Sequence, residues 1–224
     1  MEMRNTNRAK TRALIVYVVA FYIVWTAWEF WGKSFLDGVI QNAILLQFVK
    51  SGVIKNLAWT VPALLLISHF ESDVCISLKE MFTTKVLWHK YLPIYLIFTV
   101  YLLAGRFLTN GKLEISGSFG LDDMIIVLFV GLTEETVFRA WLLNATFREN
   151  KRWIYIVVNA LMFLAIHFPK WISSGTFISN FTGLGFISIL VLSVIFSWTF
   201  VKSRSIIIPI TLHMYWDLLM LMFY

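Results

Sequence analysis

The chain has 224 residues, of which 59% are hydrophobic, 17% are aromatic and only 14% are charged. Soluble domains carry about 25% charged residues, so this composition excludes an ordinary soluble protein and indicates a polytopic membrane protein. The formal net charge of +6 comes from basic residues that lie in short gaps between apolar runs. That pattern is a topology signal, and nucleic-acid binding is not expected. The single cysteine, Cys75, excludes an intramolecular disulfide and a thiolate cluster for a metal.

Apolar stretches predict about seven membrane-spanning helices, since about 20 apolar residues cross a bilayer. The whole chain, 1–224, is therefore expected to form one all-α integral-membrane domain. Residues 39–49 have apolar positions at helical spacing, which predicts either an amphipathic interfacial helix or the beginning of the second span. Residues 71–90 predict a further interfacial segment. The predicted spans are 13–31, 53–70, 91–109, 121–146, 153–168, 176–201 and 205–223.

The lysines and arginines also predict an orientation. With the N-terminus inside, twelve of them lie in inside segments, Arg4 among them, and six in outside segments. The positive-inside rule therefore favours a cytoplasmic N-terminus in the cell membrane. The outside set includes Lys55, which is expected to snorkel to the headgroups. Glu29, near the end of a span, is likewise expected to be solvated.

The span at 121–146 carries Glu134, Glu135 and Arg139 near its middle. A charged side chain at that depth costs roughly 2.5–3.5 kcal/mol on insertion scales, so intramembrane charges indicate a functional site by default. Glu135 and Arg139 are four residues apart and are predicted to form an ion pair on one helix face. Glu134 lies about 100° further round the helix and is left free to act on water as a general base.

Two other predicted spans carry ionisable residues at a matching depth. Glu134 and His167 each lie roughly 20 Å from the cytoplasmic ends of their helices. His213 and Asp217 lie roughly 12 and 18 Å along the last helix, four residues apart, so Asp217 could orient or charge the imidazole. All of these positions fall within one slab of a core about 30 Å thick, and we expect them to form one site.

Three motifs in chain order resemble those of a known family. They are Glu134-Glu135-x-x-x-Arg139, Phe163-x-x-x-His167 and His213-x-x-x-Asp217. Together they resemble the motifs of the CPBP intramembrane proteases over about residues 120–220. This family contains the CAAX-prenyl endopeptidases of the Ras-converting type and many bacterial bacteriocin-immunity and peptide-processing proteins.

The resemblance implies a metal-free intramembrane glutamic endopeptidase without a cofactor. Glu134, aided by His167, would activate water, while His213 and Asp217 would bind the oxyanion or position the substrate. An ionised Asp217 cannot donate a hydrogen bond, which makes His213 the expected donor. Phe163 would support the site, and the pair of Glu135 with Arg139 would be structural. The implied substrate is a membrane-associated peptide or protein tail within the lipid bilayer.

Three alternatives remain open. Glu134, His167 and His213 could ligate zinc and leave a fourth position for water. The chain could instead be a non-catalytic immunity or scaffold protein of the same fold. It could also be a proton-coupled transporter, because chains of Glu, His and Asp serve proton pathways in membranes. Nothing in the sequence predicts an oligomeric state.

Overall fold

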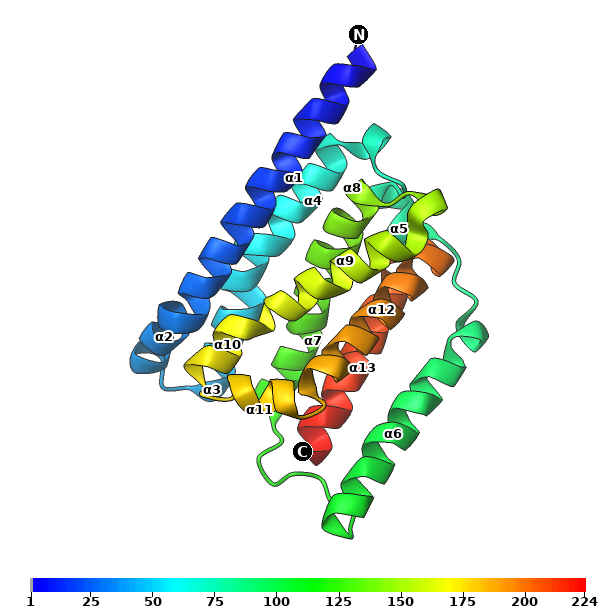
Figure 1. Cartoon of the computed structure of the whole chain (residues 1–224). Helices are drawn as coiled ribbons and strands as arrows, with labels where there is room; N and C mark the ends of the chain where they lie inside the picture. The colour runs from blue at the N-terminus through cyan, green and yellow to red at the C-terminus, as the bar shows by residue number, and fades with distance from the viewer. Residues whose placement is uncertain (1) are drawn as a thin grey trace.

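The computed structural model describes residues 2–224, with side chains from Arg8 onward. Arg4, which belongs to the inside set of basic residues, lies outside the described side chains. The described residues are mostly helical and contain no strand, so the predicted all-α class is confirmed. Figure 1 shows the longer helices packed as a bundle, with the N-terminus at one end and the C-terminus near the other.

The first two helical runs are interrupted by π-helical turns and together span most of residues 2–69. The first run consists of α1 (Glu2–Ala27), η1 (Trp28–Gly32) and α2 (Lys33–Val39). The second consists of α3 (Ala43–Gln47), η2 (Phe48–Ile54), η3 (Asn56–Thr60) and α4 (Val61–His69). Residues 71–90 then form only short pieces, namely η4 (Glu71–Asp73), α5 (Leu78–Thr83) and η5 (Trp88–Lys90).

The rest of the chain contributes the centre and one side of the bundle. A single helix, α6 (Leu92–Asn110), precedes the central run of α7 (Leu121–Glu135), η6 (Thr136–Leu143) and α8 (Asn144–Thr146). After the turn η7 (Glu149–Lys151) follow α9 (Arg152–Ala165), α10 (His167–Ser173) and α11 (Phe177–Thr182). The last two helices are α12 (Gly185–Ser203) and α13 (Ile207–Phe223).

Five helical runs within the described residues are long and apolar enough to cross a membrane, so the predicted number of seven spans is not confirmed. These runs are Arg8–Val39, Ala43–His69, Leu92–Asn110, Glu149–Ser173 and Gly185–Ser203. Two further elements, the central run that begins with α7 and the helix α13, lie in the same bundle (Figure 1). They do not meet the same criteria of length and hydropathy. The central run holds several charged residues, and α13 is only 17 residues long. The two helices that depart from the span pattern are those that carry both glutamates, Arg139, His213 and Asp217.

Some predicted boundaries differ from the observed ones. Residues 43–49 belong to the continuous helical run Ala43–His69. Of the two predicted alternatives, they therefore form the beginning of the second span and not a separate interfacial helix. The fifth predicted span corresponds to α9, which ends at Ala165 before Pro169. The helical run then continues through α10, where Pro169 lies in the first turn and its missing N–H leaves no backbone hydrogen bond unmade. The sixth begins at Gly185 rather than 176, since α11 forms a short separate helix.

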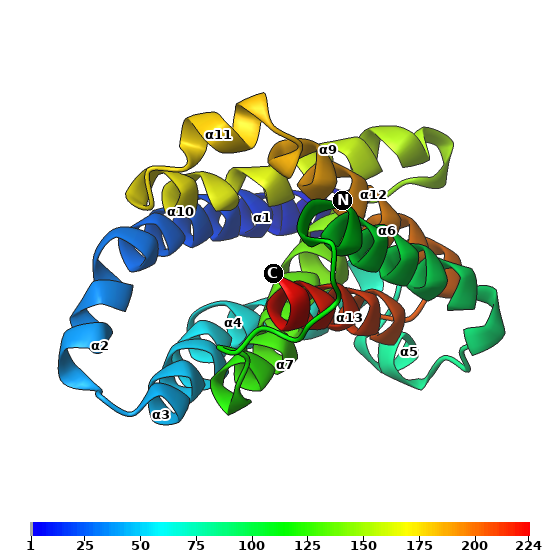
Figure 2. The ribbon, with the colours of Figure 1, turned by 90° about the horizontal axis from the view of Figure 1, so that it is seen from below.

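A close approach of α7 to α13 places the charged residues next to each other. A Cβ on Gly131 would lie 2.9 Å from the Cγ atom of Met214 and 3.3 Å from its backbone nitrogen. Such contacts are too short for any other residue without a shift, so this glycine permits the two helices to pack tightly. Glu134 and Glu135 follow within about one turn of Gly131, and His213 precedes Met214. Figure 2, seen from the end near α2 and α3, shows α7 and α13 side by side.

Candidate active site

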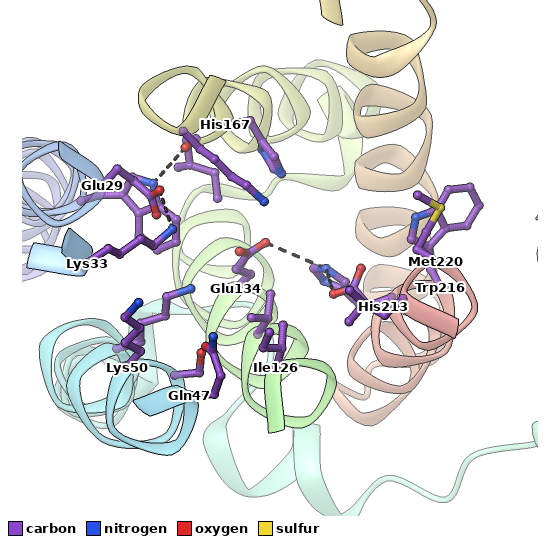
Figure 3. A pocket seen from close by; sticks show the side chains of 18 residues that line it. Glu29, Lys33, Gln47, Lys50, Ile126, Glu134, His167, His213, Trp216 and Met220 are labelled. Carbon is purple, nitrogen blue, oxygen red and sulfur yellow. Dashed lines mark hydrogen bonds and ion pairs between the residues drawn. The ribbon is translucent and has the colours of Figure 1, made fainter. Parts of the chain in front are cut away.

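A cavity of about 460 Å³ lies within the half of the bundle that is remote from the N-terminus. This volume falls in the range of pockets that bind small ligands or short chain segments. Its lining includes Glu134, His167, His213 and Asp217, which come from α7, α10 and α13. The structure thus brings together the four residues that the sequence places at matching depth. Figure 3 shows Glu134 in the middle of the cavity, between His167 and His213.

Behind the cavity, Glu135 and Arg139 form an ion pair within one helical run. The guanidinium Nη1 atom donates to Oε1 of Glu135 at 3.0 Å, and both side chains have 0% exposure. The other terminal nitrogen donates to the backbone oxygen of Ser193 at 3.2 Å and to its hydroxyl at 2.6 Å. A buried arginine therefore ties η6 to α12 by charge-assisted hydrogen bonds.

Arg139 is also held between aromatic rings. Its guanidinium carbon lies 4.5 Å from the centroid of Phe163 and 5.5 Å from that of Phe196. These cation–π contacts stabilise a charge that is removed from water. Phe163 additionally makes edge contacts with the rings of His167 and His213, at centroid distances of 5.3 and 6.0 Å. The aromatic residue of the second motif thus contacts residues of all three motifs.

His213 is oriented by Glu135. Its Nδ1 atom lies 2.8 Å from Oε1 of Glu135, the same oxygen that accepts from Arg139. Because that carboxylate is paired with an arginine and can only accept, Nδ1 carries a proton and donates a hydrogen bond to Oε1 of Glu135. Asp217, expected from its spacing to orient the ring, instead has Oδ2 at 3.5 Å from Nε2. Spacing within one helix could not reveal the contact to Glu135, which depends on how α7 packs against α13.

The Nε2 edge of His213 faces two carboxylates. Oε2 of Glu134 lies 3.9 Å from this nitrogen, and Asp217 lies on the same edge. Phe196 stacks on the ring at a centroid distance of 5.1 Å and so fixes its plane. We call Glu134, His213 and Asp217 the carboxylate wall of the cavity.

His167 presents a different atom to the cavity. Its Nδ1 atom lies 3.1 Å from the backbone oxygen of Phe163, which can only accept, so Nδ1 is the protonated nitrogen. The remaining nitrogen, Nε2, then carries a lone pair. In Figure 3 the His167 side chain points into the cavity toward Glu134. A carboxylate and an imidazole acceptor at one cavity can together accept hydrogen bonds from one water molecule.

The cavity also has basic residues that motif comparison missed. Lys33, Lys50, Lys55 and Lys170 line it, and we call them the lysine wall. Figure 3 shows Lys33 and Lys50 on the side of the cavity opposite His213. The expectation that Lys55 snorkels to headgroups is wrong, because the residue is buried and its ammonium lies 5.1 Å from the ring centroid of Trp25.

Glu29 likewise differs from its expected solvated position. It is buried, lines the cavity and accepts a hydrogen bond from Lys33 at 2.5 Å. The spacing of Glu29 and Lys33, four residues apart, is the only sequence signal that could have indicated the pair. Their place at a cavity depends on the packing of η1 against α10.

The alternative of a zinc site stays a prediction. Among the described residues, no group of three His, Cys, Asp or Glu side chains converges closely enough to hold a metal ion. The Nδ1 atoms of His167 and His213 are engaged by Phe163 and Glu135, respectively, which leaves the Nε2 atom of each ring toward the cavity. A histidine that ligates zinc through Nε2 commonly makes the same kind of contact with its Nδ1 atom, so these hydrogen bonds do not distinguish a metal site from a metal-free one.

Comparison with protein families identifies the region that contains the site. Residues 118–219 match the family described as Type II CAAX prenyl endopeptidase Rce1-like. The match covers somewhat less than half of the chain, which thus contains a region similar to this family, called the Rce1-like region below. The resemblance to CAAX-type proteases inferred from the three motifs is therefore confirmed, and the family is one of membrane proteases. The Rce1-like region contains all three motifs and the carboxylate wall, whereas Lys33, Lys50 and Lys55 precede it. Comparisons with curated proteins and with solved structures find no match.

Proposed function

We propose that the Rce1-like region hydrolyses peptide bonds of membrane-associated peptides or protein tails, with Glu134 as the general base. The observation that carries this proposal is the placement of Glu134 at the cavity beside the Nε2 edge of His213, at 3.9 Å. Glu135, the neighbouring carboxylate, is occupied by Arg139 and His213. The two adjacent glutamates thus have separate tasks, one toward substrate and one toward the protein interior.

The reaction uses one water molecule and no cofactor. Glu134 and the Nε2 atom of His167 hold the water, and its oxygen attacks the peptide carbonyl carbon while its proton passes to Glu134. The oxyanion that forms accepts a hydrogen bond from Nε2 of His213 when that imidazole carries both protons. Glu134 then returns the proton to the leaving nitrogen as the C–N bond breaks. Asp217 lies beside Nε2 and stabilises the imidazole when it carries both protons.

The stacking of His213 supports this division of roles. Its ring is held by Phe196 and by the hydrogen bond to Glu135, so it has little freedom to turn when substrate binds. Oxyanion stabilisation depends on donors that are fixed in place before charge develops. An ordered imidazole at the cavity meets that requirement, and it does so without a metal.

The decisive test compares peptides in membranes and medium from cells that produce the wild type or the Glu134→Ala variant at equal levels. Hydrolysis predicts peptides that occur only with the wild type, and their ends identify the substrate and the bond. Identical peptide sets together with an unchanged phenotype would instead establish the non-catalytic immunity or scaffold role. Purified protein in vesicles should also cleave a peptide so identified in the presence of a chelator.

We also propose that the N-terminus is cytoplasmic, which places the cavity in the outer half of the membrane. Cys75, the single cysteine, is exposed and lies between α4 and α5 at the opposite end of the bundle from the cavity. In intact cells a membrane-permeant maleimide should label it, and an impermeant one should not. Labelling by the impermeant reagent would reverse this orientation.

A further inference from the structure

The lysine wall contains one cation without an anionic partner. Lys55 has only 8% of its surface exposed, and no carboxylate among the described residues lies within ion-pair distance of its ammonium. Its ammonium lies 5.1 Å from the ring centroid of Trp25 and faces the same cavity as Glu134, which lies beyond ion-pair distance. Burying a charge is unfavourable unless the charge is paired, and a cation–π contact offsets only part of that penalty. An anion that enters the cavity would therefore stabilise the buried ammonium of Lys55.

The other three lysines differ from Lys55 in this respect. Lys33 is bonded to Glu29, and Lys50 is bonded to Asp37. Lys170 is exposed at the cavity mouth, where water can solvate it. These side chains raise the positive potential around the opening but have solvent or partners of their own. Only Lys55 among the four combines burial, a place on the lining and the absence of a carboxylate partner.

The two walls of the cavity have opposite charge. Glu134 and Asp217 lie on the carboxylate wall, which repels an anionic group of a bound chain. The lysine wall attracts it, so a peptide with a carboxylate near its reacting bond can lie across the cavity in only one favourable direction.

We propose that Lys55 binds a carboxylate of the substrate and thereby orients the peptide with its reacting carbonyl toward Glu134. The carboxylate comes either from the free C-terminus of the substrate or from an Asp or Glu side chain near the cleaved bond. This inference rests on the proposed peptidase function and adds a substrate feature to it. Lys55 is a specificity-determining residue, because it contacts substrate at a distance from the reacting atoms.

The test uses a mixed-sequence library of short peptides incubated with purified protein in phospholipid vesicles. Each sequence is made as a free acid and as a C-terminal amide, and both forms are made with and without Asp and Glu. The wild type should cleave peptides that carry the relevant carboxylate at least about tenfold faster than those without it, the usual effect of a hydrogen bond to a charged group. Amides with acidic side chains and acids without them separate the two sources of the carboxylate.

Lys55→Met should abolish this preference, because the KM of carboxylate-bearing peptides rises to that of carboxylate-free peptides. Lys55→Arg should restore the preference. Lys112→Met provides a control, because Lys112 is exposed, paired with Glu114 and does not line the cavity. If Lys55→Met slows carboxylate-free peptides equally, Lys55 acts on Glu134 rather than on substrate, and the proposal is overturned. Equal cleavage of all four peptide forms by the wild type also overturns it.

Binding in an inactive background separates this inference from the proposed function. The Glu134→Gln protein should retain free acids or acidic peptides in preference to neutral ones, and adding Lys55→Met should remove that preference. Such retention, without cleavage of any peptide by the wild type, would support the anion site and refute the peptidase. Cleavage by the wild type without a carboxylate preference would refute the anion site and support the peptidase.

Discussion

The two walls of the cavity are built in different ways. Behind the carboxylate wall, Glu135, Arg139 and Ser193 form a dense set of hydrogen bonds, and the first two side chains have no exposure at all. The lysine wall has two ion pairs, one exposed lysine and one buried lysine without a carboxylate. The carboxylate wall is supported by hydrogen bonds within the protein, although Oε2 of Glu135 and Nε of Arg139 have no partner among the described residues. In our proposal the lysine wall keeps one charge for a ligand.

In our proposal, the carboxylate wall carries the chemistry and the lysine wall carries the recognition. Groups that stabilise a transition state must be held in place, and the buried pair with Arg139 holds His213. A group that selects substrates gains most from an interaction that is completed only on binding. Substitutions can remove each part of this difference in turn, with expected effects that range from loss of turnover to a small change in stability.

Glu134→Gln removes the proposed general base from the carboxylate wall and preserves the shape of the side chain. Peptide turnover should fall by about 10²–10⁴-fold, the usual contribution of general base catalysis. The thermal unfolding temperature in detergent should stay within a few degrees, because no hydrogen bond in the described structure depends on this carboxylate. Turnover equal to that of the wild type would refute the role of Glu134.

Arg139→Ala removes the support beneath the carboxylate wall. Glu135 would remain buried without its cation, and breaking a buried ion pair destabilises proteins by about 3–5 kcal/mol. We expect less protein in the membrane and a lower unfolding temperature. Arg139→Lys should recover only part of the lost stability. A lysine ammonium lacks the planar guanidinium, whose two terminal nitrogens donate to Glu135 and Ser193 at the same time. Unchanged accumulation and thermal stability would exclude the structural role of the pair.

Gly131→Ala displaces the carboxylate wall without changing any of its polar groups. The added Cβ would meet Met214, so α7 and α13 must separate, and overpacking of this kind costs about 1–3 kcal/mol. Turnover should fall because the contact of His213 with Glu135 lengthens. Gly38→Ala is the control, since nothing lies within 4 Å of the added atom. Equal activities of the two variants would show that the close approach is not required.

The pair of Arg204 with Glu80 is an exposed counterpart of the buried pair. Their side chains are 50% and 37% exposed, and Nε of Arg204 donates to Oε1 of Glu80 at 2.5 Å. This hydrogen bond lowers the pKa of Glu80 below its ordinary value. Glu80→Gln should reduce stability by less than about 1 kcal/mol, because solvent screens an exposed pair.

The pH dependence of this small effect has a defined sign. Since the pKa of Glu80 is lower in the folded state, the pair stabilises the fold above the unfolded pKa and the contribution disappears as pH falls through the folded pKa. The difference in unfolding temperature between wild type and Glu80→Gln should therefore shrink on acidification. A difference that grows toward acid pH would contradict this assignment.

The sequence by itself determined the helical class, because apolar runs of membrane length leave no other way to satisfy the backbone hydrogen bonds. It also identified the four lining residues of the motifs and the pair of Glu135 with Arg139, since four-residue spacing places two side chains on one helix face. The number of spans was less determined, because the polar central run and the short α13 do not satisfy a simple length and hydropathy rule.

Only the tertiary structure decided which helices exchange contacts across the cavity. Glu135 rather than Asp217 accepts the hydrogen bond from Nδ1 of His213, since Gly131 permits α7 to approach α13. Lys55 and Glu29 looked like residues at span ends, yet the packing of the first two helical runs turns them into the cavity. A periodic pattern describes one helix at a time, whereas a site is formed between helices, where packing chooses the partners.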